Sequence, residues 1–247
     1  MSSKPYLLFD AGGTLVFPDL EYLAEVAGDF GIKTTSEMLF YRHCQLLFEL
    51  DESCLRKGSF EPWPSGYPKV LFENLQLPDG HLDGILNRVM KRDQRKSLWT
   101  YTYPWIPETL SQLISLGYQM AVISNSDGRA EMILEDLGLT QYFNRIFDSS
   151  FLGVEKPHRG IFEIALNELD ILPSDAIYIG DVFFIDVWGA NHAGVGSIHL
   201  DPMDLYQSWP GIHIPSVRHL PDWLDAYILN PISYDLFPGK KMQLDFE

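Results

Sequence analysis

The chain has 247 residues, of which 46% are hydrophobic and 21% are charged, and its formal net charge is −16. This composition is typical of a globular protein with one large domain, or one domain that carries an insertion. The negative charge argues against binding to nucleic-acid backbones, which requires clustered lysine and arginine. It does not exclude a small anionic substrate, because a bound cation and a lysine can reverse the potential inside a cleft.

The N-terminal segment has no apolar signal region and leads directly into a predicted strand. No apolar run approaches the roughly 20 residues that a membrane-spanning helix needs. Cys44 and Cys54 fit no zinc-binding spacing, so we expect reduced thiols. These features predict a cytoplasmic protein without a membrane partner.

The first predicted element is a buried strand over the apolar run Tyr6–Phe9, and it ends at Asp10. The next residues, Ala11-Gly12-Gly13-Thr14, predict a glycine-rich turn. This segment is expected to present one carboxylate at the end of a strand.

Residues 19–98 show helical periodicity and no convincing strand. The predicted helices are Tyr22–Phe30, Ser36–Leu55 and Leu82–Arg92. A loop between helices is indicated by Pro62, Trp63, Pro64, Gly66 and Pro68. We expect this segment to be a helical cap, inserted after the first strand and placed over the carboxyl edge of a sheet.

From residue 99 onward, helices and strands alternate. The predicted helices are Pro107–Leu116, Ala130–Leu137, Gly160–Leu169 and Asp186–Ala193, and the predicted strands are Gln119–Ile123, Arg145–Asp148, Ala176–Ile179 and Gly196–His199. This alternation predicts an α/β fold with a doubly wound parallel sheet, built from residues 1–18 and 99–247. The tail 231–247 is expected to pack on this core. Right-handed crossovers bring the carboxyl ends of the strands to one edge, where ligands bind.

Polar residues follow directly after three of the predicted strands. They are Asp10, Ser124 with Asn125, and Asp181 with Asp186 shortly after it. A loop between the second and third groups carries Lys156, followed by Pro157. A carboxylate nucleophile, a hydroxyl, a lysine and an acidic pair suit the transfer of a phosphoryl group with Mg2+.

In this order, the four segments resemble the four sequence motifs of the haloacid dehalogenase superfamily of hydrolases. The segments are Phe9–Leu15, Ser124-Asn125, Lys156-Pro157 and Gly180–Asp186. The resemblance covers about residues 6–15 and 103–200, and the insert lies where many members carry a cap. One such motif would be weak evidence, but four accidental matches in order are improbable.

The resemblance implies a nucleophile and a metal site. Asp10 would attack phosphorus and form an aspartyl-phosphate. Mg2+ would be held by the Asp10 carboxylate, the backbone carbonyl of Gly12 and Asp181. Asp186 would belong to the same metal site and orient a metal-bound water or Lys156.

The resemblance also implies contacts to the phosphate. Ser124 and the amide of Asn125 would donate hydrogen bonds to its oxygens, and Lys156 would neutralise the charge of the transition state. Thr14 would brace the turn below the nucleophile.

Each candidate also has a purely structural interpretation. Asp10 would then be a turn residue, Ser124 a helix N-cap, Lys156 a surface charge, and Asp181 with Asp186 a capping pair.

Position 12 is glycine, whereas phosphatases of this superfamily usually carry a second aspartate there. That aspartate protonates the leaving group and later activates water, and such catalysis is worth about 10²–10⁴ in rate. We therefore expect slow hydrolysis of ordinary alkyl phosphates. A phosphohydrolase would then prefer good leaving groups or use a carboxylate of the insert. The candidates are Glu49, Asp51 and Glu52, although a solvated helix face is the expected place for all three.

Two other functions remain open. Dehalogenases of the superfamily also lack this aspartate and work without metal, and Tyr41–Leu47 resembles their substrate-binding stretch. Arg42 is thus expected to bind a substrate carboxylate or a phosphate, although the pair Asp181 and Asp186 suits a metal instead. Phosphonate-cleaving relatives keep Mg2+ and use a lysine of the insert. Candidates for this role are Lys57, Lys69, Lys91 and Lys96. The last alternative is a protein that binds a ligand without turnover.

From the sequence we therefore predict a Mg2+-dependent phosphohydrolase that acts on a small phosphorylated molecule. The sequence indicates neither the physiological substrate nor the oligomeric state.

Overall fold

A parallel sheet forms the centre of the molecule. The computed structural model describes residues 4–60, 66–73, 75, 80–229 and 235–237. Within these residues, six strands form the sheet in the order β5-β4-β1-β6-β7-β8, and all neighbours are parallel. They are β1 (Tyr6–Phe9), β4 (Met120–Ser124), β5 (Arg145–Asp148), β6 (Ala176–Gly180), β7 (Gly196–Leu200) and β8 (His213–Ile214). The predicted α/β fold is confirmed, with β8 as a strand that the sequence did not indicate.

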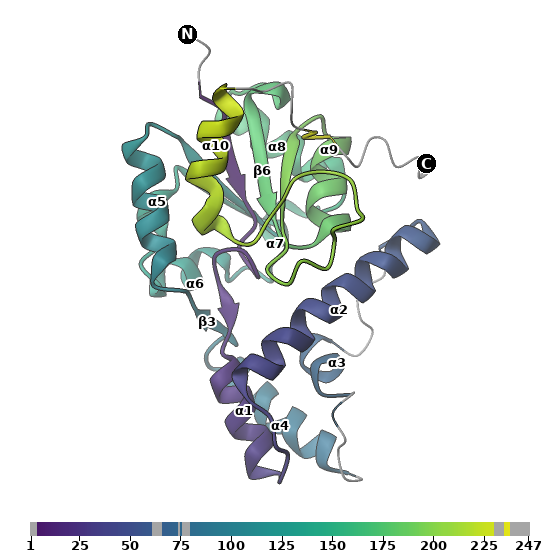
Figure 1. Cartoon of the computed structure of the whole chain (residues 1–247). Helices are drawn as coiled ribbons and strands as arrows, with labels where there is room; N and C mark the ends of the chain where they lie inside the picture. The colour runs from purple at the N-terminus through teal and green to yellow at the C-terminus, as the bar shows by residue number, and fades with distance from the viewer. Residues whose placement is uncertain (1–3, 61–65, 74, 76–79, 230–234, 238–247) are drawn as a thin grey trace.

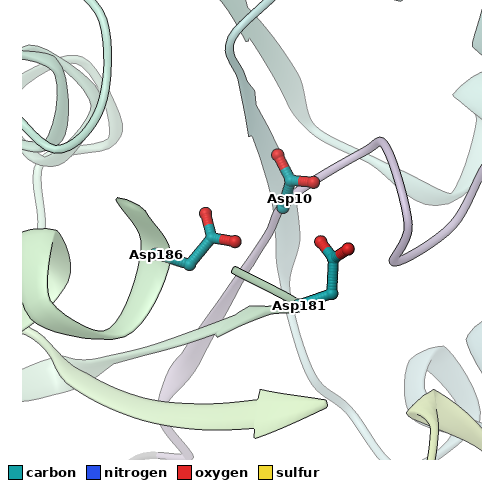
Figure 2. Close-up of side chains that lie close together, drawn as sticks. All are labelled: Asp10, Asp181 and Asp186. Carbon is teal, nitrogen blue, oxygen red and sulfur yellow. The ribbon is translucent and has the colours of Figure 1, made fainter. Parts of the chain in front are cut away.

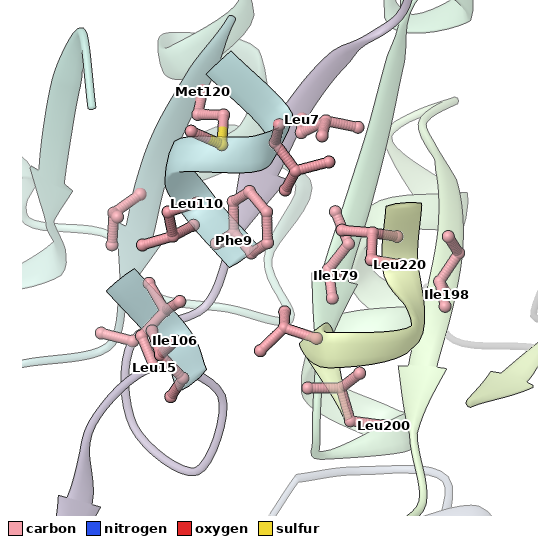
Figure 3. Packing of buried hydrophobic residues seen from close by; sticks show 14 of the residues in the cluster. Leu7, Phe9, Leu15, Ile106, Leu110, Met120, Ile179, Ile198, Leu200 and Leu220 are labelled. Atoms are coloured by element: carbon pink, nitrogen blue, oxygen red, sulfur yellow. The ribbon is translucent and has the colours of Figure 1, made fainter. Parts of the chain in front are cut away.

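Helices cover both faces of the sheet (Figure 1). One face carries α5 (Trp105–Ser115), α6 (Ala130–Asp136) and α10 (Leu220–Leu229), and the other carries α8 (Arg159–Leu169) and α9 (Gly189–His192). Successive residues of β1 alternate between these layers, as the period of a strand requires. Leu7 and Phe9 pack toward α5 and α10 (Figure 3), whereas Tyr6 and Leu8 pack toward α8. Because both faces are buried, the central strands are apolar at nearly every position.

The segment expected to form a helical insert, residues 19–98, is mostly helical in its described part. Its helices are α1 (Leu20–Asp29), α2 (Ser36–Lys57), α3 (Tyr67–Glu73) and α4 (His81–Asp93). The side chains of Asp19 and Thr35 cap α1 and α2 by accepting hydrogen bonds from backbone amides. The insert has an apolar core of its own, which includes Leu23, Leu39 and Ile85. Three of its helices were predicted. Helix α3 was not, and the predicted loop residues Pro62, Trp63 and Pro64 lie outside the described residues.

Two short strands join the insert to the sheet. β2 (Phe17–Pro18) leads into α1, and β3 (Trp99–Tyr101) leads back from α4 to α5. They pair with each other in antiparallel register. An ion pair between Arg129 and Asp93 links the insert to the core at this junction.

The long helix α2 also packs directly against the core. Leu50 and Cys54 share a buried cluster with Phe184 and Trp188. These aromatic residues belong to η3 (Phe183–Trp188), a π-helix that continues into α9. The sequence predicted one helix over Asp186–Ala193, so this prediction began three residues too late.

Shorter elements complete the described fold. They are α7 (Ser149–Leu152), η1 (Thr140–Tyr142), η2 (Pro173–Asp175) and η4 (Val217–His219). Of the C-terminal tail, residues 235–237 are described, and Leu236 is buried against the core as expected. Among the described helices, none combines the length and apolar character needed to cross a membrane.

Candidate active site

Three carboxylates meet at the carboxyl edge of the sheet (Figure 2). Asp10 follows β1, Asp181 follows the neighbouring strand β6, and Asp186 lies in η3. One carboxylate oxygen of each lies within 4.8 Å of the others, and all three residues are buried. The fold thus gathers three acids that are far apart in the sequence.

Lys156 places one positive charge among these acids. Its side chain is 1% exposed, and its Nζ donates to Asp10 Oδ1 at 2.5 Å and to Asp186 Oδ1 at 2.7 Å. The Tyr178 hydroxyl lies 2.7 Å from the same nitrogen. Lys156 is therefore a buried part of the acidic cluster, and the interpretation as a surface charge is wrong.

Asn125 holds the loop that delivers this lysine. Its side-chain Oδ1 accepts from the backbone amide of Lys156, and its Nδ2 donates to the Lys156 carbonyl, both at 2.8 Å. The side chain is thus engaged in positioning the loop. The sequence predicts only a phosphate contact for Asn125, because a partner 31 positions away leaves no local pattern.

The cluster carries more negative charge than Lys156 balances. Burial raises the pKa of Asp10 to about 6, although Lys156 acts in the opposite direction. Burial, together with the nearby Asp10 and Asp186, also raises the pKa of Asp181 well above its usual value. Burial disfavours the charged form of Lys156, but its two carboxylate partners outweigh this and raise its pKa. A divalent cation with oxygen ligands would compensate the remaining charge. The residues present therefore fit a Mg2+ site.

Two glycines of the motifs make room for the carboxylates. A Cβ atom at Gly13 would lie 1.9 Å from Asp181 Oδ2, and the φ of +78° at this residue also disfavours a side chain. A Cβ atom at Gly180 would lie 2.4 Å from the carboxyl carbon of Asp186. Thr14 Oγ1 donates to Asp181 Oδ1 at 3.4 Å, and its predicted role in bracing the turn remains a prediction.

Gly12 faces an aromatic ring. A Cβ atom built at this position would lie 3.3 Å from Cζ3 of Trp99, which comes from the junction strand β3. The ring thus lies in close contact with the position from which the usual second aspartate would project.

A cavity of about 410 Å³ opens beside these residues. Its lining includes Gly12, Trp99, Ser124, Asn125 and Arg129. Arg129 was not singled out from the sequence. Its guanidinium is held by Asp127 and Asp93, and only the fold shows that it reaches this cavity.

Arg42 does not line this cavity. Its guanidinium pairs with Glu49 of the same helix at 2.8 Å. The predicted contact between Arg42 and the substrate therefore remains a prediction.

The three candidate acids of α2 differ in their surroundings. Glu49 and Glu52 are exposed, as expected, but Asp51 is fully buried, so its predicted place on a solvated face is wrong. Its carboxylate accepts hydrogen bonds from the amides of Phe183 and Phe184 and from the Tyr206 hydroxyl. Burial raises the pKa of Asp51 to about 7 even though these donors favour the charged form.

None of the four candidate lysines of the insert lies in the buried acidic cluster. Lys57, Lys91 and Lys96 are exposed, and Lys69 pairs with Glu73 at 3.6 Å. A lysine that forms a Schiff base needs a lowered pKa, which burial or a neighbouring cation supplies. The described geometry thus lends no support to phosphonate-cleaving chemistry.

Comparison with known proteins identifies the family. The family model for haloacid dehalogenase-like hydrolases matches residues 69–200. The chain is also 30% identical to the glyceraldehyde 3-phosphate phosphatase of Pyrococcus furiosus, over 78% of each chain. This protein belongs to the haloacid dehalogenase-like hydrolase family. It has the α/β fold of that family.

Other relatives match over shorter stretches. Haloacid dehalogenase-like hydrolase domain-containing protein 3 is 37% identical in Xenopus laevis and 38% identical in Homo sapiens. These matches cover 40% and 48% of this chain, and 41% and 50% of the relatives. The chain thus spans half or less of their length. A ribulose-1,5-bisphosphate 5-phosphatase of Halopiger xanaduensis is 34% identical over 41% of this chain and 43% of that protein.

Solved structures of the same family share the fold. A dehalogenase structure aligns with a TM-score of 0.61 and 20% identity, over 90% of this chain and 98% of that one. The putative hydrolase YfnB of Bacillus subtilis, bound to magnesium, aligns with a TM-score of 0.59 and 16% identity, over 90% of this chain and 100% of that one. At these identities the likeness concerns the fold alone.

Proposed function

We propose that this hydrolase is a Mg2+-dependent phosphohydrolase that uses Asp10 as its nucleophile. The observation that carries the proposal is the buried cluster of Asp10, Asp181, Asp186 and Lys156 at the sheet edge. The relatives from Pyrococcus furiosus and Halopiger xanaduensis, both named as phosphatases of small phosphorylated sugars or aldehydes, support this reaction class.

Each residue has a role that follows from its place. Asp10 presents a carboxylate oxygen to phosphorus, and the bond from phosphorus to the leaving group breaks as the new bond forms. Lys156 holds that carboxylate in position and supplies positive charge beside it. Ser124 lines the adjacent cavity, from where its hydroxyl can donate to a phosphate oxygen.

Asp10, the carbonyl of Gly12, and Asp181 would hold Mg2+, with Asp186 orienting Lys156 and the water next to the metal. When bound, Mg2+ would neutralise charge on the phosphate oxygens during transfer. The same acidic cluster argues against metal-free displacement of halide. Without a metal, Lys156 would be the one cation in contact with three buried carboxylates in the described site.

The leaving group receives no acid from position 12. Trp99 covers Gly12, so this part of the cavity offers an aromatic ring in place of a proton donor. We therefore propose substrates whose leaving group departs without protonation, such as acyl or aryl phosphates. The helical insert, residues 19–98, would act as the cap that completes the substrate cavity.

A screen for release of phosphate tests this function. Alkyl, aryl and acyl phosphates are each incubated with excess Mg2+ or with a chelator, and 2-haloacids are assayed for release of halide. We expect Mg2+-dependent phosphate release that is fastest for acyl or aryl phosphates.

Two variants control this screen. Asp10→Asn removes the nucleophile and should abolish turnover, whereas Asp136→Asn makes the same change at an exposed position and should leave it intact. Phosphate release that persists in chelator, or turnover that survives in Asp10→Asn, would refute the proposal. Halide release in chelator would identify a dehalogenase instead.

A further inference from the structure

Asp51 is a buried carboxylate of the insert that contacts the core at one defined place. It lies near the C-terminal end of α2, 132 and 133 positions before its amide partners. Phe183 N donates to Asp51 Oδ2 at 2.9 Å, and Phe184 N donates to Oδ1 at 2.8 Å. The Tyr206 hydroxyl donates to Oδ2 at 2.6 Å. Both oxygens of this carboxylate therefore accept hydrogen bonds from the core.

These two amides are the first of the helix that carries Asp186. The residue before that helix, Val182, provides no side-chain cap. The first amides of a helix have no partner within it, and an acidic side chain is the favoured partner there. Asp51 supplies this cap from the insert, although capping residues normally come from the helix's own N-terminus.

The capped segment links two acids of the proposed metal site. Phe183 and Phe184 lie between Asp181 and Asp186 in the chain. The backbone carbonyl of Asp181 accepts a hydrogen bond from His199 Nε2 at 3.0 Å. Val182 N donates to Asp186 Oδ2 at 3.0 Å. Asp51 is thus the contribution of the insert to a network that otherwise belongs to the core.

Apolar contacts hold Asp51 in this place. Phe48, one turn earlier in α2, packs on Tyr206 with ring centroids 5.0 Å apart. Cys54, one turn later, packs with Phe184 and Trp188. Tyr206 is itself fixed, because its amide donates to Asp201 at 2.8 Å. The carboxylate therefore sits at the centre of the interface between α2 and the core.

We infer that Asp51 is a positioning residue for the divalent cation site. Through Asp51, the placement of the insert sets the affinity of this site for Mg2+. This inference rests on the proposed function. Loss of the cap would loosen the start of η3 and let Asp181 and Asp186 depart from their common geometry. Mutation of residues that orient metal ligands without binding the metal commonly lowers metal affinity by about 10–100-fold. Cation binding should in turn favour the docked insert, because such coupling is reciprocal.

The test compares Mg2+ binding and amide exchange in the full chain. Mg2+ affinity is measured by calorimetry without substrate, and hydrogen exchange is followed at the amides of residues 182–188. In Asp51→Asn, one acceptor oxygen becomes an amide group that cannot accept from a backbone N–H. We expect Mg2+ affinity to fall about tenfold and these amides to exchange faster before any Mg2+ is added.

Two further variants separate positioning from packing. Cys54→Ala removes contacts with Phe184 and Trp188 but keeps the carboxylate, so it should lower the Tm without a matching loss of Mg2+ affinity. Tyr206→Phe keeps both amide bonds and should bind Mg2+ within about threefold of wild type. If Asp51→Asn does not fold, Asp51→Glu takes its place, and the same loss of affinity is expected because the longer side chain displaces the carboxylate.

The outcomes distinguish this inference from the proposed function. Wild-type affinity and exchange in the Asp51 variant would overturn the inference alone. Affinity that follows the Tm equally in the Asp51 and Cys54 variants would also overturn it, because it would reduce Asp51 to a packing residue. A wild-type chain that binds no Mg2+ would overturn the proposed function, and with it the claim on affinity.

Discussion

At the scale of single residues, Trp99 lies beside position 12, which carries no acid. Its ring lies 3.3 Å from where the Cβ atom of a side chain at this position would be. The ring also lines the cavity and packs on Tyr67, with centroids 5.8 Å apart. A side chain at position 12 would therefore have to share its space with this ring.

A change of Gly12 alone should consequently fail to restore acid–base catalysis. Gly12→Asp is expected to leave hydrolysis of alkyl phosphates within about threefold of wild type, because Trp99 denies the carboxylate its place. Gly12→Asp combined with Trp99→Val should raise kcat by about 10², since the acid then has room to reach the leaving group. Steady-state kinetics on one alkyl phosphate, with Trp99→Val as control, measures both. Acceleration by Gly12→Asp alone would show that the ring does not block the position.

The sequence could predict the chemical residues of the site but not their supports. Asp10, Ser124 and Asp181 each end or follow an apolar strand, and parallel strands must meet at one edge. Asn125 as the holder of Lys156, and Trp99 as the neighbour of Gly12, depend on contacts between distant segments. Such contacts leave no local pattern in the sequence.

At the scale of elements, the end of β6 and the start of η3 form one closely packed unit. A Cβ atom at Gly180, the last residue of β6, would lie 2.4 Å from the carboxyl carbon of Asp186. Local periodicity predicted the helix only from Asp186, whereas η3 begins at Phe183. The difference has a physical cause: the cap for its first amides is Asp51, which lies more than a hundred positions away.

Gly180→Ala tests how closely this unit is packed. The added methyl group would overlap the Asp186 carboxyl group, so Asp186 must shift and Lys156 with it. A displacement of about 1 Å in a catalytic group can cost about 10² in rate, and we expect a loss of kcat/KM of that order. Gly28→Ala is the matched control, because nothing lies within 4 Å of a Cβ atom there. Equal activity of the two variants would contradict the tight fit.

At the scale of the whole molecule, a helical insert packs on an α/β core through two kinds of contact. The paired strands β2 and β3 connect the two parts covalently, and α2 packs against η3. The sequence predicted the insert because its helical periodicity interrupts the alternation of strands and helices. It could not predict the second contact, because the apolar residues of α2 that face the core follow the same periodicity as those that face the insert.

The stability of the molecule should depend on pH through His43 of α2. Burial lowers the pKa of this side chain to about 4, and its ring packs 5.5 Å from that of Tyr67. The unfolded chain takes up the proton below pH of about 6.5, while the folded chain stays neutral until the pH nears its lower pKa, so acidification favours unfolding.

Relative to His43→Leu, the wild type should lose about 1–2 kcal/mol of unfolding free energy between pH 7 and pH 5. Urea unfolding of both proteins at the two pH values measures this difference. Comparison of the two proteins cancels the contributions of other groups, including Asp10 and Asp51, whose raised pKa values act in the opposite direction. A difference that does not change with pH would show that His43 is not held neutral.

Trapping of the phosphorylated enzyme tests whether Asp10 is the nucleophile. The wild-type protein is mixed with Mg2+ and an acyl or aryl phosphate that carries labelled phosphate, the reaction is stopped in acid, and the labelled peptide is identified. Because position 12 offers no base to activate water, the phosphorylated carboxylate should accumulate on Asp10, and Asp10→Asn should carry no label. Label on another residue, or active turnover without any label on the protein, would contradict nucleophilic attack by Asp10.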